Sequence, residues 1–271
     1  MPEAHMLAEG DGGRAVPLPR APILELRGIS KRFGAVEALT DVDFEVFPGE
    51  VVALVGDNGA GKSTLIKCVA GTHAPDDGTI VFEGEEVRIH TPHDATRLGI
   101  ETVYQDLALC DNLDVVQNMF LGRERMAVVL PHLVATLSEL DMEKQSLEVL
   151  ASLQVTTIGN VRTRVAALSG GQRQSVAISR AVMWNSKLVI LDEPTAALGV
   201  AQTEQVLALI RRLREQGLGV VVITHNLHEL FEIADRIIVL RLGRRVATFD
   251  QKATTPEEVV AAITGARQAA A

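Results

Sequence analysis

Alternating hydrophobic and polar residues mark the first part of the chain as a set of short strands. Residues 23–29 and 42–46 alternate in this way, as half-buried strands do. Residues 79–82 and 86–89 predict a hairpin, whereas residues 51–55 form a continuous apolar run typical of a fully buried strand. The first 90 residues are therefore predicted to form antiparallel strands around one strand–loop–helix unit.

The second half of the chain alternates between helical and strand periods. The predicted order is helix 171–183, strand 188–191, helix 203–216, strand 219–224, helix 227–234 and strand 236–240. One face of helix 203–216 is apolar, and the other carries Arg211, Arg212 and Arg214, which we interpret as a solvated face and nothing more. Strands that alternate with helices predict a parallel sheet covered on both sides.

The middle and the two ends of the chain follow other patterns. Residues 106–167 show no convincing strand, and leucines recur there at near-helical spacing, at positions 140, 147, 150 and 153. We therefore expect a helical insert between strand-rich regions. Residues 1–20 predict a flexible tail, residues 21–250 the folded domain, and residues 251–271 a C-terminal tail with a short helix.

Composition and charge exclude several classes of protein. The 271 residues carry a net charge of −9, which argues against nucleic-acid binding through a basic face. Two cysteines, Cys68 and Cys110, are too few for a disulfide framework or a four-ligand zinc site, so a reducing, cytosolic compartment is expected. No run approaches the roughly 18 apolar residues that span a bilayer, and residues 1–20 lack the apolar core of a secretory signal. A role at a membrane would require other chains to hold this one there.

A phosphate-binding pattern follows the predicted strand 51–55. Gly56-Asp57-Asn58-Gly59-Ala60-Gly61-Lys62-Ser63 matches G-x-x-x-x-G-K-[ST], and with Thr64 it opens a predicted helix. Glycines let backbone N–H groups converge on phosphate oxygens, and the helix adds its positive N-terminus. Lys62 would reach the β- and γ-phosphates, and the Ser63 hydroxyl would ligate Mg²⁺. The alternative is a glycine turn with an incidental lysine.

Two carboxylates end the predicted strand 188–191. Open α/β sheets bind ligands at the carboxyl ends of their strands. Asp192 would therefore join the Mg²⁺ shell, and Glu193 would orient an attacking water or accept its proton. A strand that simply ends at a polar loop is the alternative, and the phosphate-binding pattern in the same chain favours the catalytic interpretation.

A third motif, Leu168-Ser169-Gly170-Gly171-Gln172, predicts a second anion cradle. Ser169 is a candidate helix N-cap, and the two glycines leave the backbone open. The chain thus has two cradles but one phosphate-binding lysine. A nucleotide held between the first cradle of one subunit and the second cradle of another would use both. The alternative is that residues 168–172 are an ordinary glycine loop that caps a helix.

Together these motifs resemble one family, the ATP-binding-cassette (ABC) ATPases, over about residues 22–245. Three more positions match that family. Phe33 stands where an aromatic residue stacks on adenine, Gln105 where a glutamine contacts the metal and the attacking water, and His225 where a histidine orients the γ-phosphate. Taken singly, these residues have ordinary alternatives: an unrelated aromatic, a solvated strand end and a helix cap.

The resemblance implies an α/β fold of the P-loop NTPase class. A RecA-like parallel sheet would carry an N-terminal antiparallel β subdomain and an inserted α-helical subdomain over residues 106–167. The family works as a head-to-tail dimer on ATP and Mg²⁺. In this chain the resemblance implies catalytic roles for Lys62, Glu193 and His225, and a metal site of Ser63, Gln105 and Asp192. Residues 169–172 of a second copy, or the matching residues of a homologous cassette, would complete each site.

Some segments are closer to one subgroup. Residues 104–109, 118–124 and 194–200 look like the ATPases of bacterial monosaccharide importers. This likeness implies a membrane permease contacted by residues 106–124, an extracytoplasmic sugar-binding protein, and a place at the cytoplasmic face of the inner membrane. Gly199 replaces the aspartate usual in the family, which puts the coupling across the dimer in doubt, although the subgroup shares this glycine.

Other functions stay open at this point. One is an ABC transporter for another substrate, an exporter among them. Another is a cytosolic ABC ATPase without a transporter, whose relatives usually carry a second cassette or long inserts that this chain lacks. A third is a nucleotide-gated adaptor that does not hydrolyse ATP, against which Glu193 and His225 argue. The identity of the sugar is not encoded in the motifs, because specificity would lie in the permease and the binding protein.

Overall fold

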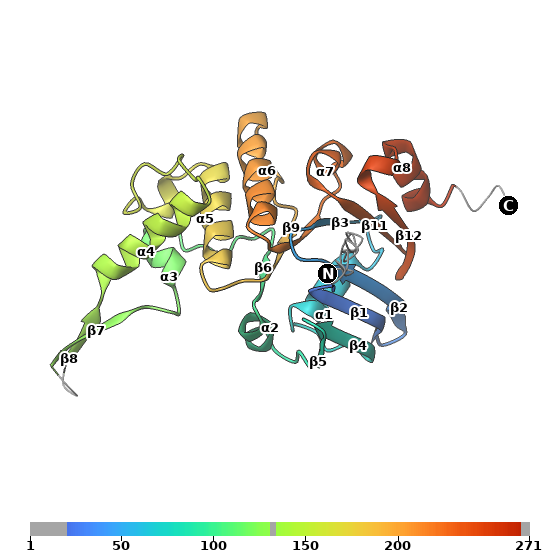
Figure 1. Cartoon of the computed structure of the whole chain (residues 1–271), viewed down its shortest axis with the longest axis horizontal. Coiled ribbons are helices and arrows are strands. Elements are labelled where there is room, and N and C mark those ends of the chain that lie inside the picture. Colours follow the sequence, from blue (N-terminus) through green and yellow to red (C-terminus); the bar gives the residue numbers. More distant parts are fainter. Residues whose placement is uncertain (1–20, 131–133, 267–271) are drawn as a thin grey trace, which may run out of the picture.

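A six-stranded sheet lies at the centre of the molecule (Figure 1). The computed structural model describes residues 21–130 and 134–266, so the expected tail at residues 1–20 lies outside the described residues. The strand order is β12 (Arg244–Asp250), β11 (Arg236–Arg241), β3 (Val51–Val55), β10 (Gly219–Ile223), β9 (Leu188–Asp192) and β6 (Ile100–Val103). The strands from β11 to β6 are parallel, and β12 joins antiparallel. The predicted parallel sheet is confirmed, with β6 and β12 as strands that the hydrophobic pattern did not predict.

The register of the parallel strands brings several loops to one edge of this sheet. Ile223 at the end of β10 lies opposite Leu54 of β3 and Asp192 of β9. Val103 at the end of β6 lies opposite Leu191 of β9. The loops that follow β3, β6, β9 and β10 therefore leave the sheet side by side.

An antiparallel sheet packs on one face of the central sheet. Its order is β2 (Val36–Val46), β1 (Leu24–Phe33), β4 (Asp77–Phe82) and β5 (Glu85–Val87), as the alternating pattern predicted. Helix α1 (Lys62–Val69) lies in the same layer, and Leu65 and Ile66 pack with Phe44 and Leu54 in one apolar cluster. The subdomain expected at the N-terminus is confirmed.

Helices cover the opposite face. α5 (Gly170–Val182) and α6 (Val200–Glu215) bury Ile178 and Leu209 against β9 and β10. The three arginines of α6 do more than face solvent, so that prediction is wrong. Arg212 donates to the carbonyl oxygen of Leu153 at 2.8 Å, and Arg211 and Arg214 form ion pairs with Glu232 and Asp235, because their long side chains reach neighbouring elements.

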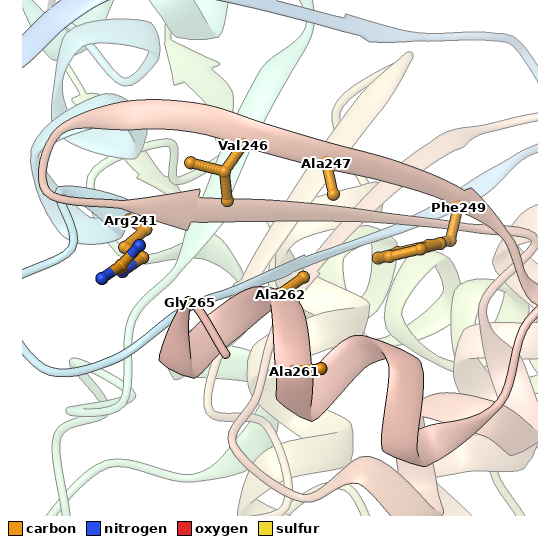
Figure 2. A pocket seen from close by; sticks show the side chains of 7 residues that line it. All are labelled: Arg241, Val246, Ala247, Phe249, Ala261, Ala262 and Gly265. Atoms are coloured by element: carbon orange, nitrogen blue, oxygen red, sulfur yellow. The ribbon is translucent and has the colours of Figure 1, made fainter. Parts of the chain in front are cut away.

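Two short helices cover the β11 side of the sheet. α7 (Leu227–Ile233) and α8 (Pro256–Thr264) bury Leu230 and Val259 against β3 and β11, and a 3-10 turn (Gln251–Ala253) precedes α8. A cavity of about 170 Å³ lies where α8 meets the β11–β12 hairpin. Figure 2 shows Phe249 and Ala262 in its lining. Part of the segment expected as a C-terminal tail is thus the packed helix α8.

The insert projects from the body at the left of Figure 1. It contains α3 (Val115–Phe120), α4 (Glu139–Ser152), the 3-10 turn Val165–Ala167, and a hairpin of β7 (Met126–Leu130) and β8 (Val134–Leu137). α2 (Pro92–Leu98) precedes β6. The hairpin corrects the prediction that residues 106–167 hold no strand. Residues 126–130 are all apolar and residues 134–137 include one polar residue, Thr136, so neither segment alternates enough to reveal a strand period.

The leucines that predicted the insert helix do not all enter its core. Leu150 and Leu153 are buried, but Leu140 is 82% exposed and Leu147 is 50% exposed. Helix α4 instead turns Met142 and Ser146 inward with Leu150. No helix in residues 21–130 or 134–266 is long and apolar enough to cross a membrane.

Candidate nucleotide site

The phosphate loop, residues 56–63, turns from β3 into α1. Lys62 Nζ donates to the carbonyl oxygens of Gly56 at 2.6 Å and Asp57 at 3.0 Å, so its ammonium lies over the loop. Burial lowers the pKa of Lys62, and the negative charges of Glu193, Asp57 and Asp192 act in the opposite sense. The loop therefore holds a partly desolvated cation beside backbone N–H groups, the arrangement that binds phosphate.

Close packing explains two glycines of this loop. A Cβ on Gly56 would lie 2.2 Å from the carbonyl oxygen of Leu240 on β11. Gly61 has φ +104°, and a Cβ there would lie 2.7 Å from the carbonyl oxygen of Ala38. Larger residues at either position would push the loop away from the sheet, because these contacts are with backbone. The other loop residues, Asn58, Gly59 and Ala60, continue the turn, and Ser63 and Thr64 follow Lys62 in the first turn of α1.

Three polar side chains lie at or just beyond the ends of β9 and β10, and two of them, Asp192 and Glu193, act electrostatically on Lys62. Asp192 ends β9, and burial, reinforced by the charge of Glu193, raises its pKa. Glu193 follows with φ +49°, and its carboxylate lies 2.9 Å from Nδ1 of His225, which comes from the end of β10. The structure thus brings Lys62, Asp192, Glu193 and His225 together at one edge of the sheet.

The donor set fits a cation that arrives with its ligand. No cluster of three or more His, Cys, Asp or Glu among the described residues could hold a metal by itself. Mg²⁺ in nucleotide sites is usually held by one or two carboxylates plus substrate phosphates. Asp192 has a raised pKa, so its negative charge is under-compensated, and the hydroxyl of Ser63 is exposed at the start of α1. These residues fit Mg²⁺ bound together with a phosphorylated ligand.

Gln105 and Phe33 lie in different surroundings. Gln105 is exposed just beyond the end of β6. Phe33 ends β1 with 45% of its surface exposed, and His73 contacts its ring edge to face, with 5.2 Å between the ring centroids. Lys31 Nζ lies 5.7 Å from the same ring. Phe33 is therefore an exposed ring held from the side, with surface free for a flat ligand.

The second cradle is well formed but lies elsewhere in the chain. Ser169 caps α5 by accepting from the N–H of Gln172, and the side chain of Gln172 accepts from the N–H of Ser169. A Cβ on Gly171 would lie 2.9 Å from Cβ of Gln202 on α6, and one on Gly170 would lie as close to Leu198. Figure 1 shows α5 and α1 on different parts of the molecule. Residues 169–172 are therefore not brought to the phosphate loop of their own chain.

Arg180 is a residue whose place the sequence pattern did not indicate. Its guanidinium is partly buried and donates to the carbonyl oxygens of Leu107 at 3.0 Å and Ala108 at 2.9 Å, and burial lowers its pKa. It fixes the chain shortly after Gln105 and lines a cavity of about 220 Å³ together with Glu101, Arg123 and Trp184. The sequence signal that could have indicated Arg180 is that it is a charged residue in an apolar stretch of a predicted helix.

Comparison with known proteins decides the family. A family model described as ABC transporter matches residues 39–196, more than half of the chain. The chain belongs to the ABC transporter family. Its fold, predicted from the motifs, is confirmed by similar solved structures. A nucleotide-free ATP-binding cassette of an ABC transporter superposes on this chain with a TM-score of 0.74 and 25% identity. The match covers 90% of this chain and 96% of that cassette. A dimeric cassette bound to ADP and phosphate has a TM-score of 0.69, 26% identity, and 85% and 100% coverage.

Curated members of the ABC transporter family are more similar in sequence. The fructose import ATP-binding protein FrcA of Rhizobium meliloti is 47% identical, covering 93% of this chain and 97% of the relative. The xylose/arabinose import ATP-binding protein XylG of Sulfolobus acidocaldarius is 48% identical, with 89% and 94% covered. A ribose import ATP-binding protein of Rubrobacter xylanophilus is 44% identical. The match spans 88% of this chain but only 46% of that relative.

Proposed function

We propose that this chain is the ATP-hydrolysing subunit of an ABC importer for a simple sugar. The meeting of Lys62, Asp192, Glu193 and His225 at one sheet edge is the observation that carries the ATPase part. The importer part is supported by the likeness to fructose and xylose/arabinose import proteins over nearly their whole length.

Binding of ATP follows from the phosphate loop. Its backbone N–H groups and Lys62 take the phosphates, and Phe33 stacks on the adenine. Ser63, Gln105 and Asp192 would hold Mg²⁺, which would neutralise phosphate charge when bound. The phosphate charge also compensates the partly buried ammonium of Lys62, so that binding offsets the cost of the desolvation that lowers its pKa.

Hydrolysis is the work of Glu193 and His225. Glu193 orients the attacking water and accepts its proton, and His225, whose ring contacts Glu193, directs its free nitrogen toward the γ-phosphate. A second copy of the chain supplies residues 169–172, and the N–H groups of Gly170 and Gly171, which the capping box leaves free, stabilise the charge of the transition state. The separation of α5 from α1 within one chain supports this head-to-tail arrangement.

A membrane permease is the partner through which hydrolysis becomes transport. Residues 106–124 are the candidate contact surface, next to the cavity lined by Glu101, Arg123, Arg180 and Trp184. Arg180 ties this surface to α5, so movement of α5 when the dimer closes reaches the permease. The permease would hold the chain at the inner face of the cell membrane, and an extracytoplasmic sugar-binding protein would deliver the substrate.

Two measurements on the full chain test the proposal. Purified chain should hydrolyse Mg·ATP, and Lys62→Ala should lose ATP affinity and turnover, whereas Lys144→Ala, at an exposed lysine of α4, should keep both. Purification from native membranes in mild detergent should recover a multi-span permease. Hydrolysis by Lys62→Ala at the parental affinity would contradict the ATP site. Recovery of soluble partners alone would contradict the importer and favour an ABC ATPase without a transporter.

A further inference from the structure

One carboxylate on α7 contacts both loops that carry the proposed catalytic groups. Glu229 Oε2 accepts a hydrogen bond from the hydroxyl of Thr195, two residues after Glu193. Glu229 Oε1 accepts from the side-chain amide of Asn226 at 2.7 Å, the residue next to His225. Thr195 and Asn226 lie on the loops that follow β9 and β10, so Glu229 joins these two loops.

The helix that carries Glu229 is firmly packed against the rest of the protein. Helix α7 is anchored by Leu230 and Ile233, both buried. Asn226 caps this helix by accepting from the N–H of His228 at 3.1 Å, and its own N–H donates to the hydroxyl of Thr224 at 3.0 Å. The position of the His225 backbone is therefore set by α7 and by β10, not by the histidine ring.

The loop after β9 has an unfavourable backbone conformation that a side-chain hydrogen bond can stabilise. Glu193 and Ala197 both have a positive φ, at +49° and +60°, a conformation unfavourable for residues other than glycine. Thr195, between them, is only 8% exposed, so its bond to Glu229 is shielded from water. A second side-chain link between the loops, from His225 to Glu193, is open to solvent because the His225 side chain is 82% exposed.

We propose that Glu229 is a positioning residue that sets Glu193 and His225 at their working separation. It acts through Thr195 and Asn226 and does not touch the nucleotide. Without it, the loop after β9 would sample other conformations, and Glu193 would spend less time aligned with the water that it activates. The inference rests on the proposed ATPase function and adds a residue to it.

The test compares variants that remove or keep the two hydrogen bonds. Thr195→Val and Glu229→Ala should each lower kcat for ATP by about tenfold or more while KM stays within about twofold, because alignment and not binding is lost. Thr195→Ser should restore kcat because it keeps the hydroxyl. Glu229→Gln should stay near the parental kcat, since its amide can accept from Asn226 and donate to the oxygen of Thr195. His228→Ala, on the same helix but pointing to Glu232, is the matched control.

Coupling measurements distinguish positioning from general damage. Thr195→Val with Glu229→Ala should be no slower than the slower single variant, because both remove the same bond. In a Glu193→Gln background, Glu229→Ala should change the residual turnover little, because the group that it positions is already disabled. Thermal unfolding should show Glu229→Gln and His228→Ala folded like the parent.

A parental kcat in both Thr195→Val and Glu229→Ala would overturn the inference. So would an equal loss of kcat in His228→Ala, or a loss of ATP affinity that matches the loss of kcat. A kcat collapse in Glu229→Gln would assign the carboxylate a direct chemical role and would also overturn positioning. If the parental chain itself hydrolyses no ATP, the proposed function fails first; if it does and these variants match it, only the role of Glu229 fails.

Discussion

Single residues at the sheet edge carry charge that the fold compensates incompletely. Burial lowers the pKa of Lys62 and raises that of Asp192, so in both groups the protein environment disfavours the charged form. A site that binds a charged ligand gains from this state, because the ligand supplies the missing counter-charge. The same reasoning at Phe33 concerns shape: an exposed ring wedged by His73 offers a ready surface to a base.

Phe33→Ala should weaken ATP binding without affecting the chemistry. Loss of a base–aromatic stack costs about 1–3 kcal/mol, or roughly tenfold to hundredfold in Kd. The kcat at saturating ATP should stay at the parental value, and Phe33→Tyr should bind as the parent does. Titration calorimetry with ATP and with tripolyphosphate separates the effects. An equal loss of tripolyphosphate affinity would show that Phe33 supports the phosphate loop and not the base.

At the scale of elements, the short helix α3 shows how side chains stabilise what helix propensity alone does not. α3 has too few residues to be stable in isolation. Asp114 and Gln117 form a capping box at its start, and Arg162 contacts Asp114 from the neighbouring loop. Asn118 is fully buried, accepts from the N–H of Cys110 at 2.7 Å, and donates to the carbonyl oxygens of Cys110 and Asp114.

Asn118→Ala should destabilise the chain by about 2–3 kcal/mol, because it strands buried backbone N–H and carbonyl groups without partners. Gln117→Ala, one residue earlier and exposed, should cost about 1 kcal/mol or less, since it removes only part of a solvent-exposed cap. Urea unfolding followed by circular dichroism gives both values. Equal losses in the two variants would show that burial of Asn118 contributes nothing beyond capping.

At the scale of the whole molecule, the chain holds its two anion cradles on separate elements. The phosphate loop precedes α1, which lies with the antiparallel sheet on one face of the central sheet. Residues 169–172 start α5, which lies on the opposite face (Figure 1). In the proposed dimer, each copy would therefore contribute one cradle to each of two sites. Gly199 caps α6 without a side-chain hydrogen bond, next to the α5 contact at Leu198.

Glu193→Gln should convert the chain into an ATP-dependent dimer. The variant keeps the phosphate loop and Asp192, so it binds Mg·ATP, but it cannot accept the proton from water. Turnover should fall by about 10²- to 10⁴-fold, and the dimer should persist with ATP in sedimentation experiments. Adding Lys62→Ala to this variant should return it to monomer. Parental turnover by Glu193→Gln would show that another group activates the water.

Local patterns in the sequence determined much of the fold and most of the candidate site. The alternation of polar and apolar residues predicted the antiparallel strands, and the apolar runs predicted β3 and β9. The residue pattern of a strand shows whether one of its faces or both are buried. The phosphate loop and the Ser169 cap are also local, since their geometry closes within a few residues. Phe33, Gln105 and His225 came from the family resemblance, because a lone aromatic, glutamine or histidine carries no local signal.

Only the tertiary structure decided the contacts between distant segments. The bonds from Glu229 to Thr195, from Arg180 to Leu107 and from Arg212 to Leu153 join side chains to loops far along the chain. The hairpin of β7 and β8 and the edge strand β12 likewise depend on pairing with a neighbour, not on their own period. Hydrophobic burial is encoded residue by residue along the chain, whereas a hydrogen bond across the fold exists only once the sheet has set its two partners side by side.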